Sequence, residues 1–397
     1  MTPTQTQDNR RVLIIGGGIG GLCLAQGLKR QGIPSTVFER DPSVTSRSQG
    51  YRLRINNDGF DALEAYLSPK ILDVFKASSA EFIPGFQFFD PKTGEPSATP
   101  PPSADDKRPS GPPPSGDVTR VFSADRVVLR SVLLLGLDSN ELRYDMAFES
   151  YTILENGLVE AVFENGERVT GSLLVGADGT FSRTPLTPEL EIALHPALHR
   201  GTSLITSREP HVSLFMEPMR FTKGNPQDIS PELPDTKDYV YWVLISRSHN
   251  FHVAGYSSDE ELLALNPAQA AELAQEMTKD WDARIRALFH CDHVGDSCGY
   301  VRVSTMPPDI GDWDAPCVTV MGDAIHAMTA AGVGANAALM DARVLLKSIQ
   351  TYGVADEAVA AYEAEMRLYA RKLVAMTAGA GKKMNDQPDF EDMKPYH

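Results

Sequence analysis

The sequence predicts an α/β protein that begins with a Rossmann-like βαβ unit, carries an inserted, mostly antiparallel sheet and ends in a long helix. Three observations predict this fold class. A glycine-rich turn lies between an apolar run and a helical pattern near the start, β-rich stretches crowd residues 200–256, and helical spacing persists over residues 356–384. With 397 residues, the chain has the length of two to three domain-sized units.

The βαβ unit is predicted from residues 11–38. Residues 11–15 form a continuous apolar run, which is typical of a parallel strand buried on both faces. Apolar residues then recur at helical spacing until Gly32, and Ser35–Phe38 form the next expected strand.

The turn inside this unit has the pattern GxGxxG. Gly16 allows a tight turn, Gly18 lets the backbone approach a pyrophosphate, and Gly21 lets the helix pack against the strand. Glu39 ends the second strand, 23 residues after Gly16, where a carboxylate accepts the two hydroxyls of an adenosine ribose. This favours FAD or NAD over NADP as the tightly bound ligand. A plain βαβ turn with a surface glutamate is the alternative, which the register of strand, helix and acid disfavours.

The rest of the chain is divided by periodicity and composition. Residues 96–116 contain eight prolines and are expected to form an exposed loop. The other predicted elements are a helix at 120–137, strands within 142–163, strands at 172–175, 212–215, 239–245 and 317–321, and a helix at 333–351.

Composition excludes several classes of protein. The net charge of −16 disfavours binding to nucleic acid or to anionic membranes. No apolar run reaches the roughly 18 residues that span a bilayer, the first ten residues are polar, and the four cysteines are too few for a disulfide framework. A cytoplasmic protein is therefore expected. The cluster Phe289–His293 with Cys298 does not match paired zinc-ligand spacings, so no metal site is predicted.

Two further glycine motifs follow predicted strands, GADGTFS at 176–182 and GDAIH at 322–326. With the first motif and Glu39, their order resembles that of the single-component FAD-dependent hydroxylases of the p-hydroxybenzoate hydroxylase type (group A monooxygenases). In size the chain is more similar to the tetracycline-inactivating enzymes and fungal natural-product hydroxylases of that family. The resemblance implies an FAD-binding part built from residues 1–77, 116–186 and 301–352. It also implies a substrate-side segment at 78–115, a substrate domain at 187–300 and a C-terminal helix at 353–397.

The resemblance also implies residue roles. The glycine turn faces the FAD pyrophosphate, Glu39 the adenine ribose, and Asp323 the ribitol region. Arg126 opens an FAD-contacting helix, Asp178 serves both FAD and NADPH, and Arg47 lies near the nicotinamide path. The complete set of implied cofactor contacts is Gly16, Gly18, Ile19, Gly20, Gly21, Glu39, Arg40, Arg47, Arg54, Arg126, Asp178, Asp323, Gly334, Ala335 and Asn336.

Two departures from the family pattern stand out. Pro185 occupies a position where the family usually has arginine, which weakens the NADPH contact expected there. Residues 327–331 replace the prolines that usually follow the histidine of the GD motif. The N-terminal amides of the helix that begins at 332–336 still point toward whatever lies in front of the helix start. If a flavin lies there, these amides would stabilise its anionic reduced form.

The resemblance implies an NAD(P)H-dependent flavoprotein monooxygenase with tightly bound FAD, transient NADPH or NADH, and O2. It would insert one oxygen atom, by hydroxylation or epoxidation through a flavin C4a-hydroperoxide, into an aromatic, polycyclic or olefinic specialised metabolite. His326, Arg220 and Tyr241 are the candidate catalytic residues, although a structural role is at least as common for each. The alternatives are an FAD-dependent reductase or dehydrogenase without oxygen insertion, and a silent FAD-binding protein. A monomer or homodimer is expected.

Overall fold

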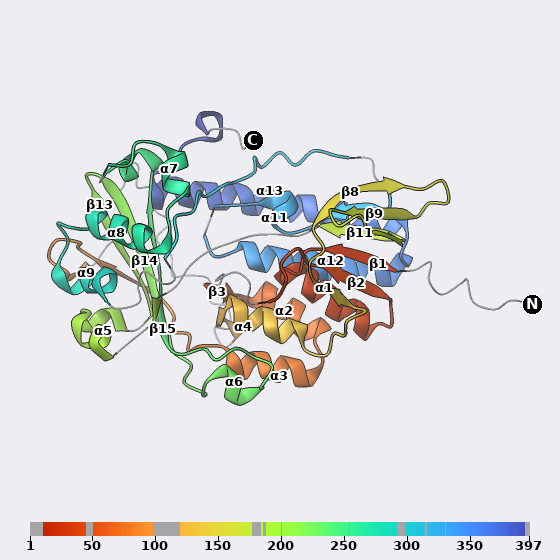
Figure 1. Cartoon of the computed structure of the whole chain (residues 1–397), viewed down its shortest axis with the longest axis horizontal. Coiled ribbons are helices and arrows are strands. Elements are labelled where there is room, and N and C mark those ends of the chain that lie inside the picture. The colour runs from red at the N-terminus through yellow and green to blue at the C-terminus, as the bar shows by residue number, and fades with distance from the viewer. Residues whose placement is uncertain are drawn as a thin grey trace, which may run out of the picture.

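Five parallel strands form the sheet around which one half of the molecule is built (Figure 1). The computed structural model describes residues 11–44, 51–97, 120–176, 184–185, 188–199, 201–253, 255–291, 298–313, 316–329 and 331–393. The strand order is β16 (Val318–Val320), β11 (Leu173–Gly176), β1 (Val12–Ile15), β2 (Ser35–Phe38) and β7 (Leu142–Arg143).

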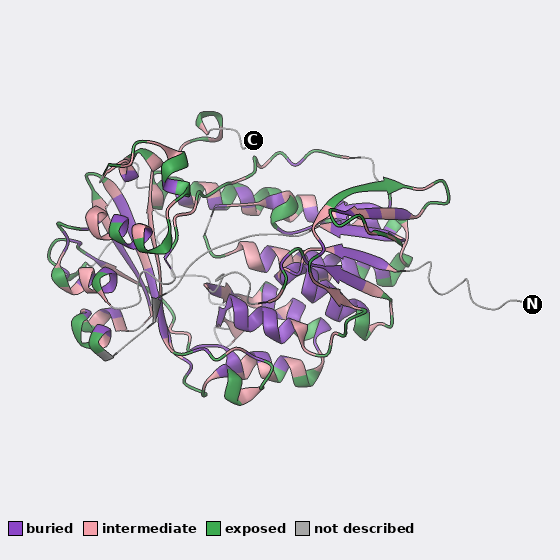
Figure 2. Ribbon diagram, in the orientation of Figure 1, coloured by how far each residue is buried: buried purple, intermediate pink, exposed green. Residues whose placement is uncertain are grey.

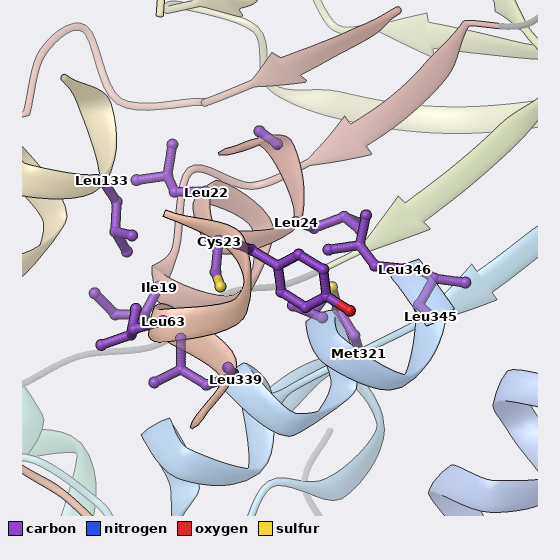
Figure 3. Close-up of a cluster of buried hydrophobic side chains, with 14 of the residues drawn as sticks. Ile19, Leu22, Cys23, Leu24, Leu63, Leu133, Met321, Leu339, Leu345 and Leu346 are labelled. Carbon is purple, nitrogen blue, oxygen red and sulfur yellow. The ribbon is translucent and has the colours of Figure 1, made fainter. Parts of the chain in front are cut away.

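Helices cover one face of this sheet, and their apolar sides meet in the cluster shown in Figure 3. Leu22 and Leu24 come from α1, Leu63 from α2, Leu133 from α4 and Leu346 from α12. The purple stretches of these helices in Figure 2 mark their buried residues. Their bounds are α1 (Ile19–Arg30), α2 (Asn57–Tyr66), α3 (Pro69–Ser78), α4 (Arg126–Leu134) and α12 (Gly334–Tyr352).

A small antiparallel sheet covers the other face. It consists of β8 (Phe148–Ile153), β9 (Val159–Phe163) and β10 (Arg168–Gly171). The rings of Phe38 and Phe163 lie 4.8 Å apart between the two sheets. Because both faces of the parallel sheet are covered, its central strands β1 and β11 carry no polar side chain.

The second half of the molecule is a six-stranded sheet on the left of Figure 1. Its neighbouring strands pair in antiparallel fashion except β13 with β4, which are parallel. Leu214, Met216 and Ile205 of one face pack against the helices outside the sheet. The strands are β12 (Thr184–Pro185), β15 (Tyr239–Ser246), β14 (His211–Met219), β13 (Thr202–Arg208), β4 (Phe86–Phe89) and β5 (Pro96–Ser97), and the helices are α5 (Pro188–Ala193), α7 (Asp259–Leu263), α8 (Pro267–Met277) and α9 (Ala283–His290).

Two elements connect the halves. The two-stranded sheet of β3 (Arg52–Ile55) and β6 (Phe122–Asp125) lies between them. Helix α13 (Asp356–Asn385) runs along the top of Figure 1 from the parallel sheet to the second sheet. At its end, the Met384 carbonyl oxygen accepts a hydrogen bond of 2.9 Å from Ser213 Oγ of β14.

The predicted fold class is confirmed, with differences at particular elements. The helix expected at 120–137 begins only at Arg126, because residues 122–125 form β6 and the Asp125 side chain caps the helix by accepting from the amides of Val127 and Val128. The first residues of the expected proline-rich loop, Pro96–Ser97, form β5, and residues 98–119 lie outside the described part. None of the described helices is long and apolar enough to span a membrane.

Candidate functional site

Three motifs follow strands that end at one edge of the parallel sheet. Neighbouring strands β1, β11 and β16 end in register at Ile15, Gly176 and Val320. The segments that follow parallel strands leave the sheet at the same edge, where open α/β sheets bind their ligands. The glycine turn at 16–21 and the GD turn at 322–326 therefore lie at this edge, and the GADG motif starts from it.

The glycine turn is built so that no side chain intrudes. Gly16 has φ +107°, a conformation that favours glycine. A Cβ atom on Gly21 would lie 2.4 Å from the Gly16 carbonyl oxygen, and one on Gly20 would lie 3.0 Å from the Met321 side chain. Helix α1 begins at Ile19 after Gly18, which offers no side chain to cap it. The N-terminal amides of α1 are thus presented to whatever lies at the sheet edge.

Glu39 lies beside this turn, as its spacing predicts. Its Oε2 accepts hydrogen bonds from the Gly17 amide at 2.9 Å and from Arg130 Nη2 at 2.8 Å, and its Oε1 accepts from the Asp41 amide at 3.0 Å. Arg130 Nε also donates to the Gly17 carbonyl oxygen at 2.7 Å. Sequence reasoning missed Arg130, although it lies one helical turn after Arg126 and so faces the same side of α4.

Arg126 and Asp323 both approach Tyr51, which precedes β3. The Arg126 guanidinium lies 5.5 Å from the centre of the Tyr51 ring. Burial raises the pKa of Tyr51, the positive charge of Arg126 lowers it, and the negative charge of Asp323 raises it, so both charges act on one hydroxyl. The charges of two residues expected at the cofactor, which come from distant parts of the chain, therefore both influence the Tyr51 hydroxyl.

The GD turn is held by a buried carboxylate that the sequence did not reveal. Asp341 of α12 accepts hydrogen bonds at Oδ2 from the Gly322 amide and from His326 Nε2, both at 2.7 Å, and at Oδ1 from the Tyr369 hydroxyl. Burial alone would lower the pKa of His326, but the Asp341 carboxylate raises it above its usual value. His326 is fully buried, and its hydrogen bond to Asp341 helps to hold the turn.

The start of α12 touches β3. The Asn336 side chain is 2 % exposed, accepts a hydrogen bond from the Asn56 amide at 2.9 Å and donates one to the Arg54 carbonyl oxygen at 2.7 Å. Its polar atoms are therefore engaged with the chain itself, and the backbone at Gly334 and Ala335 is what this helix start offers to a ligand. Gly334 lies beside Asp323, since a Cβ atom there would be 3.9 Å from Asp323 Oδ1.

The two remaining candidates for catalysis lie on the second sheet. Tyr241 is opposite Glu217 in the pairing of β15 with β14, on the sheet face that meets β3. Arg220 is at the end of β14, ion-paired with Glu191 at 2.7 Å, and lines a cavity of about 460 Å³ together with His199 and Glu217. Glu217 therefore neighbours both candidates, as the cross-strand partner of Tyr241 and as a member of the cavity lining that includes Arg220.

The remaining predicted site residues lie outside the described part of the chain or on its surface. Arg47 and Asp178 lie outside the described residues, as does residue 293 of the histidine and cysteine cluster. Arg40 follows Glu39 and is exposed. Within the described ranges, no three His, Cys, Asp or Glu side chains gather as metal ligands would.

The residues at the sheet edge fit a dinucleotide. Among the described helices of eight or more residues, α1 and α12 are the two that begin with neither a capping side chain nor an acidic residue in the first turn. They begin side by side, because a Cβ atom on Gly20 would lie 3.1 Å from the Ala338 methyl group. Phosphate oxygens match such uncapped amides. Glu39 Oε1 accepts one described hydrogen bond, so it retains capacity for a ribose hydroxyl.

Fold and site together define a Rossmann-like dinucleotide-binding protein with a second, mostly antiparallel sheet. Residues 14–75 match the family of NAD(P)-binding Rossmann-like domains. The chain is 31% identical over 98% of its length to a dual O-methyltransferase/FAD-dependent monooxygenase of Phaeosphaeria nodorum, of which it covers 48%. It is 27% identical over 89% of its length to an FAD-dependent monooxygenase of Emericella nidulans, of which it covers 92%. The chain spans about half the length of the first of these relatives.

Solved structures share the fold. A putative FAD-containing monooxygenase from Photorhabdus luminescens superposes with a TM-score of 0.75 at 24% identity, over 96% of this chain and 100% of that one. Klebsiella pneumoniae HpxO, solved with FAD and uric acid, superposes with a TM-score of 0.71 at 15% identity, over 97% of this chain and 90% of that one. The chain is a homologue of FAD-dependent monooxygenases, and the resemblance predicted from its motifs is confirmed.

Proposed function

We propose that the chain binds FAD tightly and uses NADPH or NADH and O2 to insert one oxygen atom into an aromatic or olefinic small molecule. The observation that carries this proposal is the arrival of three glycine motifs at one sheet edge, beside two uncapped helix starts. The similarity to fungal FAD-dependent monooxygenases along nearly the whole chain supports it.

The chain's own residues would hold FAD as follows. The amides of the glycine turn would donate to the pyrophosphate, Glu39 would accept from the adenine ribose, and Asp323 would accept from the ribitol chain. Arg126 would stay close to the phosphates, and the backbone at the start of α12 would face the flavin ring. When bound, FAD supplies the redox chemistry that reduces O2 with electrons from the nicotinamide. Contacts by Arg47 and Asp178, and the division into FAD-binding segments 1–77, 116–186 and 301–352, remain part of this proposal.

The substrate would lie on the face of the second sheet that meets β3. Phe215 and Tyr241 of this face are partly exposed, with ring centres 5.9 Å apart, and Phe86 is 55% exposed beside them. Flat aromatic rings pack well on such a surface and exclude water from the reaction. Relatives that join oxygenation to O-methyl transfer in one protein support a product with a new hydroxyl group, which is the group that an O-methyltransferase consumes.

The test is spectroscopic. The purified protein should show the absorbance of oxidised flavin, which bleaches under NADPH without oxygen, bleaches faster with a polycyclic phenol, and returns in air. Mass spectrometry with 18O2 should then find one labelled oxygen in the product. Consumption of NADPH without O2 uptake would instead favour a reductase, and a protein that takes up no FAD would contradict the proposal.

A variant pair tests the site itself. Arg126→Gln should weaken FAD binding about tenfold or more, since it removes one charge-assisted contact. Arg168→Gln is the matched control, because Arg168 is 62% exposed and pairs with Glu160 on the far β10–β9 sheet. Equal FAD affinity of the two variants would remove Arg126 from the site. Light scattering on the same samples distinguishes a monomer from a homodimer.

A further inference from the structure

The segment that follows the GD turn, residues 327–329, has one hydroxyl side chain with which to fix its position. Its sequence is Ala-Met-Thr, and because it contains no proline, no ring restricts its backbone dihedral angles. The Ala327 carbonyl oxygen accepts a hydrogen bond of 2.8 Å from the Met306 amide, which holds the start of the segment. The segment also borders the start of α12, since a Cβ atom on Gly334 would lie 4.0 Å from Met328 Cγ.

The hydroxyl at the end of this segment reaches the C-terminal part of the chain. Thr329 is 5% exposed, and its Oγ1 donates a hydrogen bond of 2.7 Å to Gln387 Oε1, 58 residues later. Nε2 of the same amide is buried and has no hydrogen-bond partner among the described residues. An unpaired buried donor lowers stability, so stabilisation of the fold does not by itself account for an amide at this position.

The end of α13 is shaped so that this amide reaches the segment. Asp386 has φ +53° and ends the helix in the left-handed conformation. The Gln387 amide then donates to the Gly381 carbonyl oxygen at 3.2 Å, so the chain folds back over Gly381. A Cβ atom on Gly381 would clash with Gln387 Oε1 and lie 2.8 Å from Thr329 Cγ2. The glycine therefore leaves the space in which the two side chains meet.

The same helix end is bound to the second sheet, which α13 reaches from the parallel sheet (Figure 1). Ser213 Oγ of β14 donates to the Met384 carbonyl oxygen at 2.9 Å. Arg247, which follows β15, donates from Nε to both the carbonyl oxygen and the carboxylate of Asp386 at 2.8 Å. The second sheet therefore helps to place Gln387, whose side chain contacts a segment of the other half.

We propose that Gln387 is a positioning residue of the flavin site: it fixes Thr329, and with it the 327–329 segment, beside the start of α12, at a position that the second sheet sets through the end of α13. The inference rests on the proposed function, in which the start of α12 faces the flavin ring. It adds a link between the half that would hold FAD and the half that would hold the substrate. A segment held in one place excludes water from the reacting atoms.

Hydrogen exchange followed by mass spectrometry tests the contact on the FAD-saturated protein. Thr329→Val removes the hydroxyl and keeps the shape of the side chain, and Gln387→Leu removes the acceptor. In both variants the peptide 322–336 should exchange about threefold faster or more, because one hydrogen bond is lost. Thr329→Ser keeps the donor and should exchange as the wild type does. Unchanged exchange in Thr329→Val and Gln387→Leu would overturn the proposal.

The visible absorbance of bound FAD shows whether the contact acts at the flavin, because the shape of this band depends on how far the ring is shielded from water. In Thr329→Val and Gln387→Leu the band should move toward that of free FAD, and in Thr329→Ser it should match the wild type. Faster exchange with an unchanged flavin band would mean that the contact serves the fold alone, and it would refute the positioning role.

A matched pair of glycine variants tests the geometry of the helix end. Gly381→Ala places a methyl group where Gln387 and Thr329 meet, so it should speed the exchange of peptide 322–336 as Gln387→Leu does. Gly379→Ala lies on the same helix with no atom within 4 Å of its added Cβ, so it should leave the exchange of this peptide unchanged. Equal exchange in the two glycine variants would contradict this geometry.

Arg247→Gln tests the link to the second sheet. It releases Asp386 from the other half of the molecule, so exchange of peptide 322–336 should again become faster although Arg247 does not belong to that half. Arg168→Gln, on the distant β10–β9 sheet, is the control and should change nothing in this peptide. Wild-type exchange in Arg247→Gln would refute the link between the sheets.

The outcomes separate this inference from the proposed function. A protein that shows the expected exchange and flavin spectra but consumes NADPH without inserting oxygen contradicts the monooxygenase and supports the role of Gln387 at the flavin. A working monooxygenase in which these substitutions change neither the exchange nor the flavin band contradicts only the role of Gln387.

Discussion

Gly21→Ala tests whether the glycine turn depends on the close approach of helix α1 to strand β1. A Cβ atom at this position would lie 2.4 Å from the Gly16 carbonyl oxygen and 3.1 Å from Ile14 Cγ2. A carbon and a carbonyl oxygen come no closer than about 3.3 Å even in weak hydrogen bonds, so the turn must open by almost 1 Å. Such overpacking costs about 1–3 kcal/mol. Alanine regains about 0.5–1 kcal/mol through its helix propensity. Because the clash is with a backbone oxygen and not with a flexible side chain, we expect a cost toward the upper end of that range and a net loss of about 1–2 kcal/mol.

Two measurements follow this change. The midpoint of thermal unfolding should fall, and FAD affinity in a flavin-fluorescence titration should fall about tenfold, because the displaced turn loses a charge-assisted contact to the pyrophosphate. Gly379→Ala is the matched control. Gly379 is an exposed glycine within α13, and no atom lies within 4 Å of its added Cβ, so this variant should unfold at a higher temperature with unchanged FAD affinity. A Gly21→Ala protein with normal stability and normal FAD binding would refute the argument from close approach.

Three other predictions concern buried charges. Glu217 of β14 forms buried ion pairs with Arg52 and Arg54 of β3, which lower its pKa from 4.5 to about 2. These pairs stabilise the fold above pH 4.5, and their contribution is lost as the pH falls from 4.5 to 2, so acid unfolding followed by fluorescence should be less steep in Glu217→Gln. Asp341→Asn should cost about 3–5 kcal/mol, measured by urea unfolding, because it leaves His326 without its buried partner. In the wild type the pKa of His326 is higher in the folded state than its value of 6.5 in the unfolded chain, so its protonation stabilises the fold below pH 6.5. This contribution to the free energy of unfolding is lost as the pH rises through the folded-state pKa, and Asp341→Asn should lack this pH dependence. Arg130→Gln should lower the thermal midpoint more without FAD than with it, because ribose hydroxyls replace the donors that Glu39 loses; an equal shift in both states would contradict a ribose contact.

The sequence predicted the parallel sheet and its edge well because those features are local. An apolar run followed by glycines marks a strand end wherever it occurs, and the distance from Gly16 to Glu39 reflects the length of one βαβ unit. The residues it missed depend on contacts between distant segments. Arg130 matters because α4 packs beside the glycine turn, and Asp341 matters because α12 passes beneath the GD turn.

Some helices that hydrophobic periodicity did not predict are marked in the sequence by their capping residues. The two helices at 259–277 begin with capping boxes, in which Ser258 pairs with Glu261 and Asn266 with Gln269. These spacings are visible in the sequence. For Asn336 the residue type indicated a ligand contact, whereas its position against β3 uses the side chain to join two segments 280 residues apart. No local pattern reports such a distance.

The strand order of the parallel sheet has a consequence for the synthesis of the chain. Strand β11 pairs with β1, more than 150 residues earlier, and with β16, more than 140 residues later. The second sheet gains its contact with Met384 later still. Contacts of such long sequence separation close slowly, and domains generally fold as units while the ribosome proceeds from the N-terminus. Neither half of this protein is therefore complete before the last quarter of the chain has emerged, and both halves acquire their final contacts in the same late interval.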